Sequence, residues 1–375
     1  MQKKILIIAG IIIIALIVVF ALIPKHSAET NDKPIIKFGI ILPLTGESAE
    51  VGQSAKAGLS MTLSDILKSS AGTRYDYKLV FEDSKSTARG TAMAAKKLIS
   101  MDHVKALFSL WEIEGAIATD IADKNNIISM SVSFGEAVLQ GKYAFNTMAS
   151  YSTQSKEMVK ELKRRGVKSV ALFIDNSEMR EQYEALEKEI KSNSNIKIVF
   201  KEYFNTGEKD YKSAIIKAAA LKPEMYLISG YPPSPYVFLK QLKELTGRND
   251  NVTCIDIFVD INSQDRVIAN GLWYVDGNSL GTPEFQQKLF DYADIETQSC
   301  TGNIVVNLQV LVAAFENAPL EPGETVPNND NIKRWILNNV KNFKTYAGNV
   351  TITDKGLIEM ENSIKIIKDG KPTAM

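Results

Sequence analysis

Apolar and polar positions alternate along most of this chain in the way expected of strands that are followed by helices. From residue 35 onward, short apolar runs bounded by turn residues indicate buried strands, and stretches with apolar residues three and four apart indicate amphipathic helices. The first strand is predicted at residues 36–42 and the next helix at 52–67, where Ala55, Leu59 and Leu63 share one face. Further strands are predicted at 77–83, 106–109 and 127–132, and further helices at 87–101 and 115–124.

A second series of strands and helices begins near residue 151. Ser152 or Thr153 can cap its first helix, which is expected to run to Arg165. The series continues with strands at 167–175, 196–203, 225–229 and 252–258, and with helices at 179–193, 209–221 and 235–245. Two separate doubly wound parallel sheets are needed to hold both series, so the predicted fold class is α/β.

The rest of the chain is too short to bury a third sheet and is expected to complete the first two. It adds a predicted strand at 271–275, helices at 283–293, 302–318 and 331–342, and a hairpin-like pair at 348–353 and 363–367 with Asp369 and Gly370 at its tip.

The N-terminus carries the longest apolar run in the sequence. Lys3 and Lys4 precede residues 5–23, which contain no charge, and Pro24 follows. As a helix rising about 1.5 Å per residue, this run nearly crosses a hydrocarbon core of about 30 Å. It predicts a membrane anchor with the body outside the cell membrane. A cleaved signal peptide is the alternative, although residues 26–28 make a poor cleavage triplet; both readings predict an extracytoplasmic protein.

The amino-acid composition limits the kinds of partner and reaction that this chain is expected to have. Lys and Arg together number 44, as do Asp and Glu, so the charge gives no reason to expect a nucleic acid partner. Cys254 and Cys300 lack the spacing of a redox pair or a zinc site, and could form one disulfide outside the cell. His26 and His103 belong to no catalytic or metal-binding motif, and no phosphate-binding glycine loop follows the first strand. The sequence therefore predicts neither an enzyme nor a bound cofactor or metal.

Several short motifs add a more specific signal through their order and spacing. They are the segment 36–46, Gly52 with Ala57-Gly58, Glu82-Asp83-Ser84, the stretch 207–211, Gly230-Tyr231 and the turn 353–356. Together they resemble the type I periplasmic binding proteins, specifically the leucine/isoleucine/valine-binding family of branched-chain amino acid ABC transporter substrate-binding proteins. The resemblance covers about residues 35–370.

This resemblance implies two Rossmann-like lobes joined by three hinge crossings. After a signal or anchor and linker at 1–34, one lobe would contain 35–150 and 277–346, and the other 151–276 and 347–372. The implied function is capture of a small solute (an amino acid, an amide, or an aromatic or apolar molecule) for an ABC importer, with the transporter permease as partner. The alternative is a membrane-anchored ectodomain that senses a ligand and acts through a partner receptor.

The resemblance also implies ligand contacts on the first lobe. Trp111 and Glu112 stand where the family usually presents small hydroxyl residues to a ligand carboxylate, and an acid there would repel such a carboxylate. Ser133, Phe134 and Gly135 match a loop that grips the same end of the ligand, with a hydroxyl and an aromatic ring available to orient and cover it.

On the second lobe, Tyr231 matches a tyrosine that covers the ligand, and Met179 stands where another aromatic residue is common. The acid that receives a ligand ammonium should fall near residues 257–258. Because successive side chains of a strand alternate faces, Asp256, Phe258 and Asp260 are expected on one side, and Phe258 becomes a candidate contact.

Each candidate also has an ordinary structural interpretation. Trp111 could anchor a loop, and Glu112 could be an acid at a helix N-terminus, which is favourable without any ligand. Phe134 and Phe258 could belong to the hydrophobic core, the usual place for aromatic residues.

Overall fold

The computed structural model describes residues 33–375, apart from residues 47, 70–72, 178, 261–264, 278 and 361–362. Residues 35–375 form one compact unit. The predicted anchor or signal at residues 5–23 lies outside the described residues. Within the described ranges, no helix is both long enough and apolar enough to cross a membrane.

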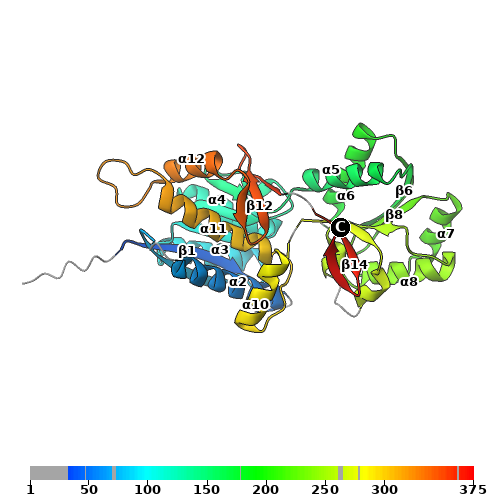
Figure 1. Ribbon diagram of the computed structural model, residues 1–375, viewed down its shortest axis with the longest axis horizontal. Coiled ribbons are helices and arrows are strands. Elements are labelled where there is room, and N and C mark those ends of the chain that lie inside the picture. The colour runs from blue at the N-terminus through cyan, green and yellow to red at the C-terminus, as the bar shows by residue number, and fades with distance from the viewer. Residues whose placement is uncertain are drawn as a thin grey trace, which may run out of the picture. The chain divides into compact units, whose positions relative to one another are not determined.

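The first series builds a five-stranded parallel sheet in the order β2-β1-β3-β4-β5 (Figure 1). Its strands are β1 (Ile35–Leu42), β2 (Asp76–Asp83), β3 (Ala106–Leu110), β4 (Ile128–Val132) and β5 (Ala144–Asn146), of which sequence analysis missed β5. Its helices are α2 (Ala49–Lys68), α3 (Ala88–Ser100) and α4 (Glu112–Lys124), with the later helices α10 (Pro283–Ala293), α11 (Thr301–Asn317) and α12 (Asn329–Asn339). The predicted helices and the other four strands of this series are confirmed to within a few residues.

Both faces of this sheet are buried at its inner strands, because most residues of β1 and every residue of β3 and β4 are buried, whichever face they lie on. In β1, Phe38 and Ile40 join a core that includes residues of α2 and α11, whereas Ile41 joins a second core with residues of α3 and α4. A hydrogen bond of 2.9 Å between the hydroxyls of Ser54 and Thr301 links α2 to α11. Helices on both faces are typical of parallel sheets.

The second series builds a four-stranded parallel sheet in the order β7-β6-β8-β9. Its strands are β6 (Ser169–Asp175), β7 (Lys197–Phe204), β8 (Met225–Ile228) and β9 (Val252–Thr253), and its helices are α5 (Tyr151–Arg164), α6 (Met179–Asn193), α7 (Lys212–Ala220) and α8 (Ser234–Thr246). In β6, Phe173 packs in a core with residues of α7 and α8, and Leu172 packs in another with residues of α5 and α6. Ser150, rather than Ser152 or Thr153, caps α5 by accepting a hydrogen bond from the Thr153 amide.

The predicted strand at 252–258 is wrong beyond its first residues. The strand β9 ends at Thr253, Asp256 adopts a positive φ of 60°, and the short helix α9 (Ile257–Asp260) begins directly after it. Asp256 and Phe258 therefore do not alternate along a strand, and the expected shared face with Asp260 does not exist.

The predicted pairing of 348–353 with 363–367 is also wrong, because these segments belong to different antiparallel sheets. One sheet contains β11 (Phe343–Thr345), β12 (Gly348–Ile352) and β13 (Ile358–Met360). The other contains β10 (Trp273–Asp276), β14 (Ser363–Lys368) and β15 (Lys371–Ala374), and Asp369 and Gly370 form the turn between its last two strands.

Candidate functional site

Two loops meet at the carboxyl ends of the neighbouring strands β3 and β4. Trp111, half-buried with a positive φ of 64°, turns the chain from β3 into α4, and its amide donates a hydrogen bond of 2.8 Å to the carbonyl of Val132 at the end of β4. Because the two parallel strands are adjacent, Glu112 at the start of α4 lies beside the loop formed by Ser133, Phe134 and Gly135. All five residues predicted here thus come together.

The carboxylate of Glu112 is the centre of this arrangement. Its Oε1 accepts hydrogen bonds from the backbone amides of Phe134 at 3.0 Å and Gly135 at 3.1 Å, and from the Tyr151 hydroxyl at 3.2 Å. The three donors, two amides and one hydroxyl, are called the amide cradle below. Hydrogen bonds to an ionised carboxylate are among the stronger ones in proteins, so the cradle is a well-defined anion site.

Tyr151 was missed by sequence analysis. Its ring stacks on that of Phe134, with centroids 5.6 Å apart and planes at 9°. No local pattern distinguishes Tyr151, because its importance comes from its contact with Glu112 of α4, which lies far away in the sequence.

The loop after β4 is held in place by the buried side-chain amide of Asn146. Asn146 accepts a hydrogen bond from the Ser133 amide at 3.1 Å and donates to the carbonyls of Ser133 at 2.7 Å and Gly135 at 3.2 Å. The Ser133 hydroxyl is itself buried and accepts from the Gly135 amide at 3.1 Å. These contacts fix the direction in which the cradle amides point.

A second group of polar residues follows the strands β6 and β8 of the other sheet. Asp175 ends β6 fully buried, and its Oδ1 accepts from the Ser177 amide at 2.9 Å and the Thr206 hydroxyl at 2.7 Å. Its Oδ2 has no hydrogen-bond partner among the described residues. Gly230 has a φ of 118°, and a Cβ there would lie 3.1 Å from this oxygen. The chain can therefore pass close to the carboxylate only with glycine at this position.

The predicted contacts of the second sheet belong to one hydrophobic core or pack against it. Tyr231 directly follows Gly230 and is half-buried against the core that contains Phe173. Met179, the first residue of α6, is 8% exposed in the same core. Phe258 is fully buried, with its ring 5.7 Å from that of Tyr274, which supports its core interpretation. Its ligand contact stays a prediction.

A buried polar network lies next to the turn at Asp256. The Gln154 amide group donates to Asp256 Oδ2, the Gly277 backbone amide donates to Oδ1 at 2.6 Å, and Gln182 donates to Gln154 at 3.1 Å. Burial raises the pKa of Asp256 to about 6, although both hydrogen bonds and the positive charge of Lys365 oppose the rise. Burial also lowers the pKa of Lys365 to about 8. Sequence analysis placed Asp256 near an ammonium site, and here its oxygens are occupied by the chain itself.

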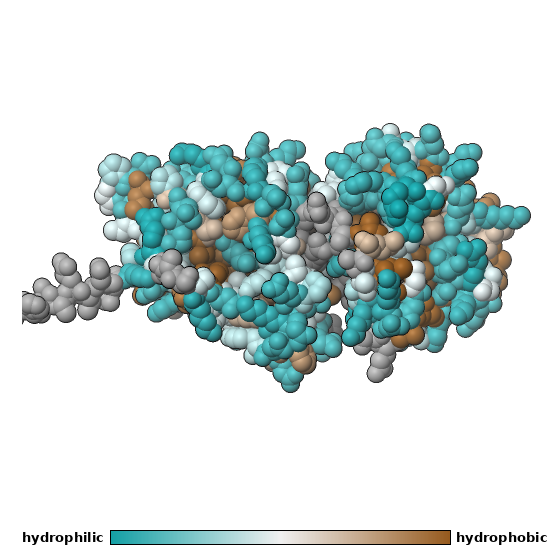
Figure 2. Space-filling view, viewed as in Figure 1, coloured by the Kyte–Doolittle hydropathy of each residue, from teal (hydrophilic) through white to brown (hydrophobic). Residues whose placement is uncertain are grey.

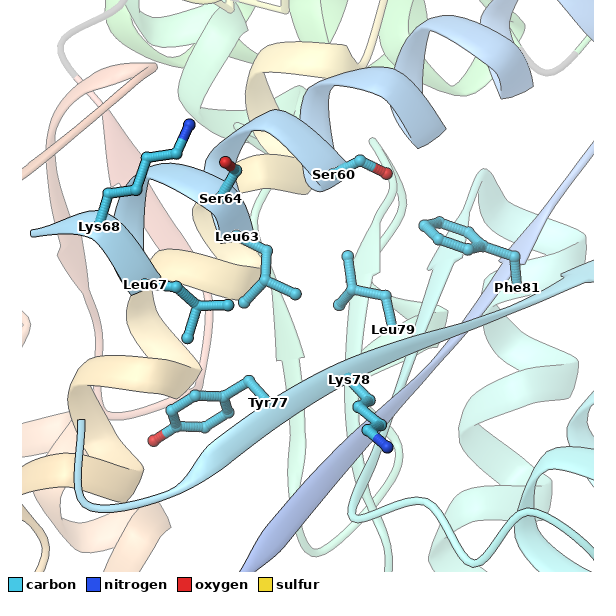
Figure 3. Close-up of a pocket in the computed structure, with 9 residues that line it drawn as sticks. All are labelled: Ser60, Leu63, Ser64, Leu67, Lys68, Tyr77, Lys78, Leu79 and Phe81. Carbon is cyan, nitrogen blue, oxygen red and sulfur yellow. The ribbon is translucent and has the colours of Figure 1, made fainter. Parts of the chain in front are cut away.

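A groove of about 590 Å³ lies elsewhere, between α2 and the edge strand β2. Figure 3 shows Leu63 from α2 and Leu79 and Phe81 from β2 pointing toward one another across it. None of the predicted ligand contacts lines it. On the face shown in Figure 2, hydrophilic residues cover most of the surface and the hydrophobic atoms form separate patches. Among the described side chains, no cluster of three His, Cys, Asp or Glu could hold a metal ion.

Comparison with known proteins adds family information. A sequence model described as periplasmic binding protein matches residues 35–359. A Pseudomonas aeruginosa protein, named as binding leucine, isoleucine, valine, threonine and alanine, is 25% identical over 214 residues, which are 56% of this chain and 57% of that protein. The matched region thus spans little more than half the length of this curated relative.

Solved structures share the fold. The branched-chain amino acid transporter substrate-binding protein LivJ from Streptococcus pneumoniae, in complex with isoleucine, has a TM-score of 0.73 and 18% identity, covering 91% of this chain and 98% of that one. An ABC transporter solute-binding protein from R. palustris, in complex with benzoate, has a TM-score of 0.73 and 14% identity, covering 91% and 95%. At these identities the likeness shows the fold alone. Together with the family match, it confirms the resemblance predicted from the sequence.

Proposed function

We propose, because this chain belongs to the periplasmic binding protein family, that it is an extracytoplasmic protein that captures a small solute without transforming it. The members of this family are substrate-binding proteins rather than enzymes. The solute classes are those of the relatives' names: a branched-chain amino acid in LivJ and an aromatic acid in the R. palustris protein. Amides, and small apolar molecules of similar size, belong to the same range.

The observation that carries the proposal is the gathering of polar, aromatic and apolar candidate contacts just after the carboxyl ends of strands in both parallel sheets. The first sheet contributes Trp111, Glu112 and Phe134, and the second contributes Met179 and Tyr231. Ligands of open α/β sheets bind outside these strand ends. Residues at two such edges allow one solute to contact both sheets.

The capture mechanism follows from the proposed lobe plan, with 35–150 and 277–346 in one lobe and 151–276 and 347–372 in the other. The lobes move about three crossings, and the solute favours the closed arrangement by the contacts that it makes only there. The closed form is then recognised by an ABC transporter permease. Residues 5–23 hold the protein at the membrane, or are removed as a signal peptide.

A ligand screen tests this function. The full chain in a mild detergent is heated with amino acids, amides, aromatic acids and peptides, and a ligand at a hundredfold excess over its Kd adds about 2.7 kcal/mol to the free energy of unfolding. We expect at least one class to raise the melting temperature. If no class does so, solute capture is contradicted.

The Tyr231→Ala variant locates the site. Removing a ring that covers the solute should weaken binding at least tenfold, or about 1.4 kcal/mol, in isothermal titration calorimetry. Tyr292→Ala is the matched control, since Tyr292 is 52% exposed on α10. Equal affinity in Tyr231→Ala and the unaltered protein would exclude Tyr231 from the site.

A further inference from the structure

The amide cradle is occupied by the chain's own carboxylate. Its three donors converge on Glu112 Oε1 at 3.0 to 3.2 Å. Two backbone amides directed at one point, with a hydroxyl beside them, form the kind of arrangement that binds a carboxylate or another small anion. In this protein that anion is supplied internally.

Glu112 is held in place from several directions. It follows Trp111, whose positive φ starts α4, and its carboxylate lies in the first turn of that helix, where a negative charge is favoured. Gly135 is packed against it, since a Cβ added there would lie 3.1 Å from Glu112 Cγ. A solute carboxylate could reach the same donors only by displacing a fixed negative charge.

The second sheet carries a negative group as well. The buried carboxylate of Asp175 ends β6 beside Gly230 and Tyr231, and its Oδ2 has no hydrogen-bond partner among the described residues. Carboxylates at the strand ends of both sheets make the region unfavourable for an anion and favourable for a neutral or positively charged solute.

We propose that Glu112 takes the place of a solute carboxylate and determines specificity, so that this protein binds amides and amines and rejects free amino acids and aromatic acids. The inference rests on the proposed solute-binding function; of the solute classes proposed above, it keeps the amides and removes the free amino acids and the aromatic acids. A glutamate that only fastened the loop of Ser133, Phe134 and Gly135 would leave the preference between acid and amide unchanged when it is replaced.

Matched solutes test the proposal in the full chain. Leucine is compared with leucinamide and benzoate with benzamide, by calorimetry and thermal shift at pH 7. In the unaltered protein, at least one amide should bind tenfold or more tightly than its acid. In Glu112→Ala the cradle is open and the charge is gone, so the acid should gain at least tenfold and overtake the amide.

Two further variants separate charge, occupancy and folding. Glu112→Gln keeps an oxygen for the cradle donors and therefore keeps the loop, but removes the charge, so the gap between amide and acid should shrink at least threefold. This variant decides the question even if Glu112→Ala fails to fold. Glu136→Ala removes an exposed charge next to the loop and should leave the gap unchanged.

The outcomes distinguish the role of Glu112 from solute capture itself. If the unaltered protein binds an acid at least as tightly as its amide, or if neither Glu112 variant narrows the gap, the role of Glu112 is overturned while solute capture stands. If none of the four solutes binds any variant, Glu112→Ala has failed to gain the acid and the role of Glu112 is again overturned. The proposed function itself fails only if the wider screen also finds no ligand.

Discussion

At the scale of the residue, Asp256 and Asp276 share the ammonium group of Lys365. Lys365 forms an ion pair with the fully buried Asp276, and its charge also stabilises ionised Asp256. Two acids and one base in a buried place carry a desolvation penalty that their attraction only partly offsets. The folded protein therefore favours the neutral forms of Asp256 and Lys365 more than the unfolded chain does.

This preference makes the free energy of unfolding depend on pH in a definite direction. Folded Asp256 keeps its proton up to about pH 6, whereas an unfolded aspartate loses it near pH 3.9. Between these values the folded state binds more protons, so the free energy of unfolding falls as the pH rises. Lys365 has the opposite effect above pH 8, because its folded pKa of about 8 lies below the unfolded value.

We expect Asp256→Asn to remove the fall in the free energy of unfolding between pH 4 and 6. At about 1.4 kcal/mol for each pH unit, the variant should gain at most about 3 kcal/mol relative to the unaltered protein as the pH rises through this window. Urea unfolding of both proteins at several pH values measures this gain in stability. Asp354→Asn, at an exposed position, is the control. Parallel pH profiles for Asp256→Asn and the unaltered protein would refute the assignment.

At the scale of the element, α2 depends on a glycine for its approach to the end of β1. A Cβ on Gly52 would lie 2.0 Å from the carbonyl oxygen of Pro43, an impossible contact with backbone. The helix and the strand end can therefore lie this close only because position 52 has no side chain.

Gly52→Ala should reverse the usual helix preference. Alanine normally stabilises a helix by about 1 kcal/mol relative to glycine. Here the helix and the strand end must move apart to make room for the new Cβ, and this displacement should lower the free energy of unfolding by about 1–3 kcal/mol. Chemical denaturation measures the sign of this change in the free energy of unfolding. Glu50→Ala is the control: Glu50 is exposed in the same turn, and its replacement should change the free energy of unfolding by less than about 0.5 kcal/mol. A Gly52→Ala protein as stable as the unaltered one would disprove the close approach.

The elements that sequence analysis found are those with strong local patterns. The helix predicted at 52–67 is α2, which buries one face at helical spacing, and the strand predicted at 36–42 is β1, which buries a nearly continuous apolar run. The errors lie where distant contacts decide the conformation. The strand predicted to end at Phe258 stops at Thr253, because the turn at Asp256 is stabilised by Gln154 and Gly277, which no local pattern reveals.

The candidate site was predictable to a similar degree. The resemblance to a family located Glu112 and the loop at Ser133, but it could not indicate that Glu112 fills the cradle, because that depends on backbone amides and on Tyr151. Residue types along the chain do not specify which side chain reaches which amide.

At the scale of the whole molecule, the two cysteines belong to different hydrophobic cores. Cys254 is buried in the core of the second sheet and Cys300 in that of the first, and no disulfide joins them. The disulfide left open by the sequence is therefore absent from this structure. Neither thiol has more than 3% of its residue surface exposed.

Thiol titration checks this arrangement. We expect neither cysteine of the native protein to react quickly with a thiol reagent, and both to react after denaturation. A reducing agent should leave the melting temperature unchanged, whereas reduction of a disulfide would typically remove about 2–4 kcal/mol of stability. Fewer than two reactive thiols in the denatured, unreduced protein would show that they are bridged.

The pairing of β10 with β14 affects the order in which the chain can fold during synthesis. Asp276 ends β10, while its counter-ion Lys365 lies in β14. At about 5–20 residues per second, the ribosome delivers that lysine on the order of ten seconds later. Until then Asp276 lacks its ion pair with Lys365, so burial of this carboxylate is less favourable before one of the last segments of the chain has been synthesised.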